Sequence, residues 1–249
     1  MDGISSINRL LPANIASNPP SFLPPCALAA PVGLPNNGVC SPTTTSRSGS
    51  TTSTPCSLLT SLCTASPTSA STGDDQVGYW KHFVQEDAYK LCEQNIDSFL
   101  QLLYPAKPEV WLEWFTPSWK SKEWVEANRT PGRPTWLSEE EYNVLRETLV
   151  RSGLKSPLTY YRAFSADSNV EEDKKISQEA LQIRKPALFI ATSKDYVCTP
   201  RDGRTNMAKF APHAKIVELN VGHWAQMEAT EQFNRVLEDW IQSLPSSGY

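Results

Sequence analysis

Pro186-Ala187-Leu188-Phe189-Ile190-Ala191-Thr192 is a short, unbroken apolar run that ends three residues before Asp195. Such a run is typical of a parallel β-strand buried on both faces. The pattern after it predicts a helix over 199–210, a second strand over 214–219 and a terminal helix over 230–244. This order indicates an α/β fold with a parallel sheet. Because two strands alone make a poor sheet, we expect the other strands to be absent or supplied elsewhere.

A carboxylate and an imidazole follow the two predicted strands. Asp195 comes after the first strand, and His223 comes after the second, next to Gly222, which permits a sharp turn. Functional groups of α/β sheets gather at this carboxyl edge. In a hydrolytic relay the imidazole deprotonates water or a hydroxyl, and a carboxylate on its other nitrogen fixes the tautomer. We therefore predict an acid–base pair, and we expect His82 and His213 to be ordinary, partly exposed histidines.

Residues 80–166 predict a nearly all-helical insert with an aromatic interior, because their apolar residues recur at helical intervals. Ser138 and Glu141 have the spacing of a capping box, and Gly153 is the expected stop of the helix that follows. The predicted helices cover 86–104, 108–115, 119–128 and 138–153, and a last one opens at Ser156-Pro157 with proline at the first helical position.

Residues 1–75 differ sharply from the rest of the chain. Up to Thr72 there are three charged side chains and one aromatic ring, whereas every Trp and Tyr lies at position 79 or later. A segment with so few bulky groups cannot offset the roughly 1–2 kcal/mol of backbone entropy lost per ordered residue. We therefore expect a disordered segment over 1–75, a helical domain over 76–168 and an α/β part over 169–249.

Composition excludes several classes of function. The formal net charge of −4 gives no basic patch, so nucleic acid is not expected as a partner. No apolar run reaches the roughly 18 residues of a transmembrane helix, and no secretory signal is evident, so we expect a cytoplasmic protein without a membrane span. The six cysteines lack C-x-x-C spacing, so neither a metal site nor a disulfide framework is expected. Cys92 and Cys198 are predicted to be buried, reduced thiols.

Four motifs within 76–244 carry a resemblance to a known family. They are Gly78-Tyr79-Trp80-Lys81, Gly153-Leu154-Lys155-Ser156-Pro157-Leu158-Thr159-Tyr160-Tyr161-Arg162, Lys194-Asp195-Tyr196-Val197-Cys198 and Gly222-His223-Trp224-Ala225-Gln226-Met227-Glu228. Together they resemble the cap and C-terminal part of soluble epoxide hydrolases of the α/β-hydrolase superfamily, of the fungal and microbial type. The resemblance implies a truncated α/β-hydrolase fold with a mainly helical cap.

The resemblance also implies roles for four residues. His223 would activate water, Asp195 would orient it, and Tyr79 and Tyr161 would donate phenolic hydrogen bonds to the oxygen of a small apolar epoxide. Two fixed donors stabilise the alkoxide that develops as the ring opens to a vicinal diol. The alternative for both tyrosines is an aromatic core residue of the helical cap. The Tyr-Tyr-Arg sequence argues against the related haloalkane dehalogenases, and no cofactor is implied.

The nucleophile of this family has no counterpart in the sequence. The family uses an aspartate in a Gly-x-Asp-x-Gly elbow, and neither that motif nor Gly-x-Ser-x-Gly occurs here. Asp74 and Asp75 lack the two glycines of an elbow and follow Ser-Thr-Gly instead of a strand. We therefore expect a truncated or misassembled epoxide hydrolase with negligible turnover. The alternative is a non-catalytic remnant that binds ligands or partners, and the oligomeric state is left open.

Overall fold

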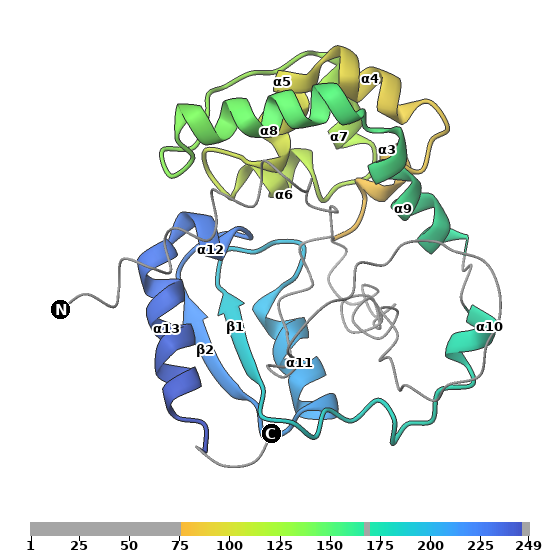
Figure 1. Cartoon of the computed structure of the whole chain (residues 1–249). Helices are drawn as coiled ribbons and strands as arrows, with labels where there is room; N and C mark the ends of the chain where they lie inside the picture. Colours follow the sequence, from red (N-terminus) through yellow and green to blue (C-terminus); the bar gives the residue numbers. More distant parts are fainter. Residues whose placement is uncertain (1–75, 167–169, 246–249) are drawn as a thin grey trace.

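The computed structural model describes residues 76–166 and 170–245. The segment expected to be disordered, 1–75, lies outside the described residues, and so does the predicted boundary between 168 and 169. The division into domains therefore stays a prediction. In the described chain, a layer of helices lies over a strand pair with its own flanking helices (Figure 1).

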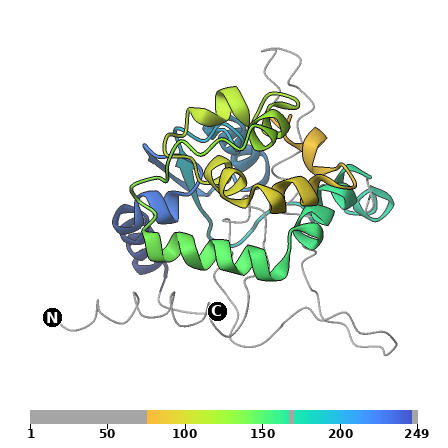
Figure 2. The same ribbon diagram turned by 90° about the horizontal axis from the view of Figure 1, so that it is seen from above.

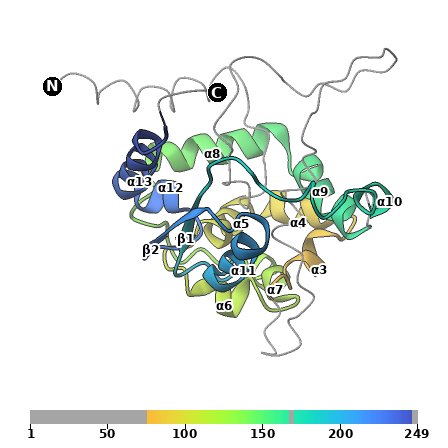
Figure 3. The same ribbon diagram turned by 90° about the horizontal axis from the view of Figure 1, so that it is seen from below.

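The strand pair confirms the predicted α/β unit. β1 (Leu188–Thr192) runs parallel to β2 (Lys215–Leu219), with Leu188 opposite Lys215 and Thr192 opposite Leu219. The connection is α11 (Pro200–Phe210), which packs against β1, while α13 (Thr230–Gln242) packs against β2. Figures 1 and 3 show these two helices on opposite sides of the strands. This is the crossover that parallel strands require.

Burial of the first strand is less complete than its sequence indicates. We expected a strand buried on both faces, but Leu188, Phe189 and Ile190 are only partly buried. Ala191 and Thr192, at the end that leads to Asp195, are buried. The described chain places one strand beside β1, and a strand needs neighbours on both sides and on both faces before all its side chains leave solvent.

The helical layer has a core of large apolar side chains. Its fully buried members include Phe83, Leu100, Leu102, Val125, Leu149 and Leu154. Seen from above, its helices lie over part of the strand pair (Figure 2). The helices are α3 (Trp80–Phe83), α4 (Ala88–Gln94), α5 (Ile96–Leu103), α6 (Val110–Trp114), α7 (Lys120–Glu126), α8 (Glu139–Ser152) and α9 (Lys155–Ser165).

The capping signals of α8 are confirmed. Ser138 Oγ accepts the N–H of Glu141 at 3.2 Å, and the Glu141 carboxylate accepts the N–H of Ser138 at 2.9 Å. Gly153 follows the helix with φ of 74°, a conformation that favours glycine. Both ends of this helix are therefore fixed by local hydrogen bonding, which is why the sequence alone located them.

The single helix predicted over 86–104 is wrong. The chain forms α4 and α5 instead, and Asn95 between them leaves the helical region with φ of −116° and ψ of 47°. The Asn95 side chain donates to the carbonyl of Val125, which belongs to α7, at 2.9 Å. A contact 30 positions away in sequence accompanies this break, and the apolar period, which continues across Asn95, gives no sign of it.

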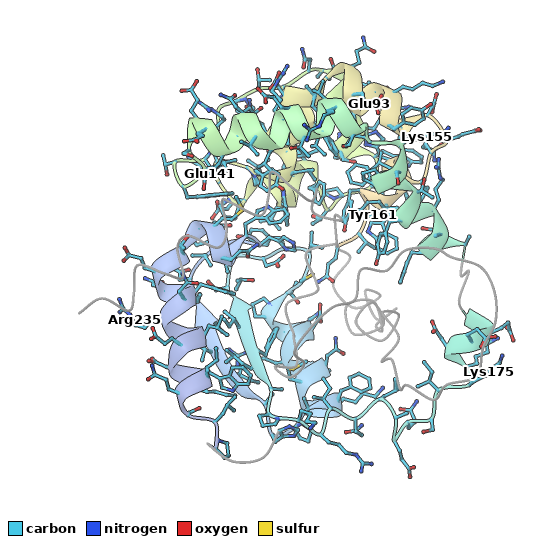
Figure 4. The ribbon with its side chains drawn as sticks, viewed as in Figure 1. Glu93, Glu141, Lys155, Tyr161, Lys175 and Arg235 are labelled. Atoms are coloured by element: carbon cyan, nitrogen blue, oxygen red, sulfur yellow. The ribbon has the colours of Figure 1, made fainter. Side chains whose placement is uncertain are left out.

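The start of α9 also differs from the prediction. The helix begins at Lys155, so Pro157 is its third residue rather than its first. Leu154, the residue before the helix, donates its N–H to Glu93 Oε1 at 2.7 Å. Figure 4 shows Glu93 and Lys155 at this junction of helices. A carboxylate from α4 therefore satisfies a backbone donor at the first turn of α9.

Two shorter helices complete the described part of the chain. α10 (Val170–Asp173) was not predicted, and α12 (Ala225–Glu228) lies within the Gly222–Glu228 motif. None of the helices in the described ranges is long and apolar enough to cross a membrane.

Candidate active site

The acid and the base predicted from the strand ends are in direct contact. His223 Nδ1 lies 2.6 Å from Asp195 Oδ2, and each side chain is only 4% exposed. The other carboxylate oxygen, Oδ1, accepts the backbone N–H groups of Val197 and Cys198, both at 2.9 Å. Because a carboxylate only accepts, Nδ1 is the donor, and neutral His223 then has its acceptor lone pair on Nε2.

The loop that carries His223 is held by Glu228. One carboxylate oxygen of Glu228 accepts the N–H of Gly222 at 2.7 Å, and the other accepts the N–H of Trp224 at 3.2 Å. The backbone donors on both sides of the imidazole therefore meet one side chain from α12. In the sequence, the only signal for this role is that Glu228 follows Gly222 by six positions and Trp224 by four.

Gly222 allows a close approach of the backbone to its surroundings. It is not among the glycines with positive φ, so its backbone conformation is open to other residues. A Cβ atom at this position would lie 2.7 Å from Glu228 Oε1 and 2.9 Å from Pro108 Cγ. The missing side chain therefore lets the histidine loop approach both its own helix and the helical layer.

The helical layer covers His223 with aromatic rings. The ring of Trp111 lies 5.0 Å from the imidazole, and Tyr104 stacks on Trp224 at 4.5 Å. Trp224 Nε1 also donates to the carbonyl of Leu103 at 2.8 Å. His223 Nε2 is buried and has no hydrogen-bond partner among the residues that the structure describes. The imidazole therefore presents a proton acceptor to a site shielded from bulk water.

The two predicted phenols lie in one aromatic cluster. Tyr79 is buried and stacks on Phe115 at 4.1 Å, and Tyr161 is partly buried with its ring 5.9 Å from that of Tyr79. Phe115 in turn stacks on Trp111, the residue that covers the imidazole. Figure 4 places Tyr161 on the side of the helical layer that faces the strands. Both phenols are thus joined to the His223 site through consecutive ring contacts.

His82 and His213, which were both expected to be partly exposed, have different environments. His82 is 1% exposed, so the expectation of partial exposure is wrong for it, while His213 is exposed and its Nε2 lies 2.8 Å from the carbonyl of Lys185. Burial, with a smaller contribution from the charge of Lys122, lowers the pKa of His82 to about 4. Sequence patterning missed this burial because a polar residue at a helical position is ordinarily assigned to the surface.

The cysteines also divide into two kinds. Cys92 is buried as predicted, and burial, with a smaller effect of the Glu93 charge, raises its pKa to about 12. Cys198 was expected to be buried and is only partly buried, and neither thiol is in a disulfide. Its Sγ, an oxygen of Asp195 and a ring nitrogen of His223 lie within 4.8 Å of one another. These are groups that bind zinc in proteins, and the prediction of no metal site is untested.

No family model matches the chain. The mouse protein named bifunctional epoxide hydrolase 2 is 32% identical over 122 residues, which is 48% of this chain and 21% of the mouse protein. Epoxide hydrolase A of Mycobacterium tuberculosis is 29% identical over 114 residues, which is 45% of this chain and 34% of that protein. The chain therefore spans about a third or less of the length of these curated relatives.

A solved structure agrees with these relatives. An epoxide hydrolase from an endophytic Streptomyces has 25% identity and a TM-score of 0.53, over 66% of this chain and 51% of the solved one. Together with this similarity, the parallel β–α–β unit with Asp195 and His223 at its strand ends, under a helical layer, places the fold in the α/β-hydrolase type. Within that type, the chain is a relative of the epoxide hydrolases over part of their length.

Proposed function

We propose that the chain binds small apolar epoxides, with His223 as the water-activating base and Asp195 as the residue that orients it. The 2.6 Å bond between these side chains is the observation that carries the proposal. It directs the free lone pair of the imidazole to Nε2, which is buried. A base that is shielded from solvent and fixed in one tautomer is suited to deprotonate a single bound water.

Tyr79 and Tyr161 are the proposed donors to the epoxide oxygen. Their ring centroids are 5.9 Å apart, so both phenols belong to one aromatic cluster. Ring opening places negative charge on that oxygen, and phenols held in an apolar cluster stabilise it without needing to reorganise. The surrounding rings favour an apolar or aryl group on the substrate.

The proposal includes binding without efficient turnover. Epoxide hydrolysis in this family proceeds through an ester with an aspartate in a Gly-x-Asp-x-Gly elbow, and the 249 residues contain no such motif. Asp74 and Asp75 lie outside the described residues. Removing the nucleophile of a covalent mechanism typically lowers the rate by about 10⁶-fold, so His223 and Asp195 alone are not expected to produce diol at a useful rate.

The test combines a binding assay with a product assay on the full chain. Styrene oxide should quench the tryptophan fluorescence in a saturable way, because Trp111 lies beside the imidazole. Diol formation should equal the rate without protein. Diol formation that disappears in the His223→Gln variant would contradict the proposed inactivity, and absence of saturable binding would contradict the epoxide site. His213→Gln is the matched control, since His213 is exposed and bonds to Lys185 instead of Asp195.

We also propose a cytoplasmic location. The support is that the buried Cys92 is not in a disulfide, which is the common state of cysteine in reducing compartments. Cell fractionation with an antibody against the chain tests this, and recovery in a secreted fraction would contradict it.

A further inference from the structure

Cys198 is held beside the acid–base pair by the loop that positions the acid. Asp195 Oδ1 accepts the N–H of Val197 and the N–H of Cys198, both at 2.9 Å. These two bonds fix the backbone of Cys198 at a set distance from the carboxylate. As a result, Sγ lies within 4.8 Å of both an Asp195 oxygen and a His223 ring nitrogen. Cys198 is partly buried and is not in a disulfide.

The neighbouring imidazole has a free site for a proton. His223 is 4% exposed, its Nδ1 bonds Asp195, and its Nε2 has no partner within the described ranges. A histidine whose second nitrogen is bonded to a carboxylate is stabilised when it takes a proton. A low-pKa, reactive cysteine is commonly found beside a histidine of this kind.

We propose that Cys198 is a reactive thiol, activated by His223 and Asp195, that forms covalent adducts with soft, neutral carbon electrophiles such as alkenes conjugated to a carbonyl. The proposal does not depend on epoxide binding, because it needs only these three side chains. Thiolates are soft and strongly nucleophilic, and a neutral electrophile is not repelled by the carboxylate.

The proposed step is a simple addition. The thiol proton passes to the imidazole of His223, and Asp195 stabilises the imidazolium. The sulfur then forms a bond to one alkene carbon, and the π electron pair moves toward the carbonyl. The adjacent carbon takes the proton from the imidazolium, so that the product is a thioether and His223 is neutral again. No oxidant, reductant or leaving group is required.

Alkylation with N-ethylmaleimide, followed by peptide mass spectrometry, measures this reactivity on the full chain. Near pH 7 an ordinary thiol is roughly 3% ionised, so an activated Cys198 should react about tenfold faster than N-acetylcysteine. Cys92 provides an internal comparison, because its thiol is buried and its pKa is raised to about 12. It should remain unmodified while the chain is folded.

Variants separate activation from simple exposure. His223→Gln should lower the rate at Cys198 about tenfold near pH 7, and Asp195→Asn should lower it as well. His213→Gln should leave the rate unchanged. Circular dichroism and the unmodified state of Cys92 establish that each variant is folded. Two results would overturn the proposal. The first is that Cys198 in the unsubstituted chain reacts no faster than N-acetylcysteine, a result that does not depend on whether any variant folds. The second is that Cys198 reacts equally fast in the unsubstituted chain and in folded His223→Gln.

Discussion

The burial of His82 makes the stability of the helical layer depend on pH. His82 is 1% exposed, its Nδ1 lies 3.2 Å from Ser121 Oγ, and its Nε2 has no partner in the described part of the chain. Burial, with a smaller effect of the Lys122 charge, lowers its pKa from 6.5 to about 4. The folded chain therefore favours neutral His82, whereas the unfolded chain takes up a proton below 6.5.

The sign and size of the effect follow from this difference. Above the unfolded pKa both states hold neutral His82, and the full stability is present. As the pH falls from 6.5 toward 4, the unfolded state binds the proton first, so the free energy of unfolding decreases. Each unit of pKa is worth about 1.4 kcal/mol, so the loss approaches roughly 3 kcal/mol and levels off below the folded pKa.

Urea unfolding followed by tryptophan fluorescence at a series of pH values measures this loss. The His82→Gln variant keeps a polar group near Ser121 but cannot titrate, so its stability should change less between about pH 6.5 and 4. Asp97, whose pKa is lowered by its hydrogen bond to Arg146, contributes a separate loss at lower pH in both chains. The difference between the two curves therefore isolates His82. Parallel curves would refute the reasoning, and His213→Gln should follow the unsubstituted chain.

Three further substitutions test the described contacts. Ser138→Ala removes the capping box of α8 and should cost about 1 kcal/mol in urea unfolding; an unchanged midpoint would contradict this. Glu228→Gln replaces a carboxylate that accepts both backbone N–H groups around His223, so the downfield imidazole proton resonance should broaden or shift, and an identical spectrum would rule out the positioning role. Gly222→Ala brings a Cβ to 2.9 Å from Pro108 Cγ and should destabilise the chain by about 1–3 kcal/mol, whereas equal stability would show that the loop can retreat.

Some helix ends can be predicted from neighbouring residues, and others cannot. The ends of α8 depend on Ser138, Glu141 and Gly153, which are all within or beside the helix. The break at Asn95 instead involves a hydrogen bond to Val125, 30 positions away. Patterning along the chain cannot report such a bond, because the partner is fixed only when α7 packs against α5.

Some features of the candidate active site could likewise be predicted from the sequence, and others could not. The order of strands and the positions of Asp195 and His223 were sufficient to predict that the two side chains meet, because parallel strands end at one edge of a sheet. Their roles in catalysis remain predictions. Three other features of the site could not be predicted from residue types, because they depend on the path of the loops in the folded chain. They are the hydrogen bonds that Glu228 accepts, the close packing at Gly222 and the position of Cys198.

The sequence by itself determined the α/β class, the helical character of 80–166 and the pairing of Asp195 with His223. These features come from hydrophobic periodicity and from strand direction, which are properties of the chain's own order. Only the tertiary structure decided that His82 is buried, that aromatic rings connect Tyr161 to the imidazole and that a thiol lies beside the acid–base pair. Burial and contact at these positions depend on how helices and strands that are far apart in sequence pack against one another.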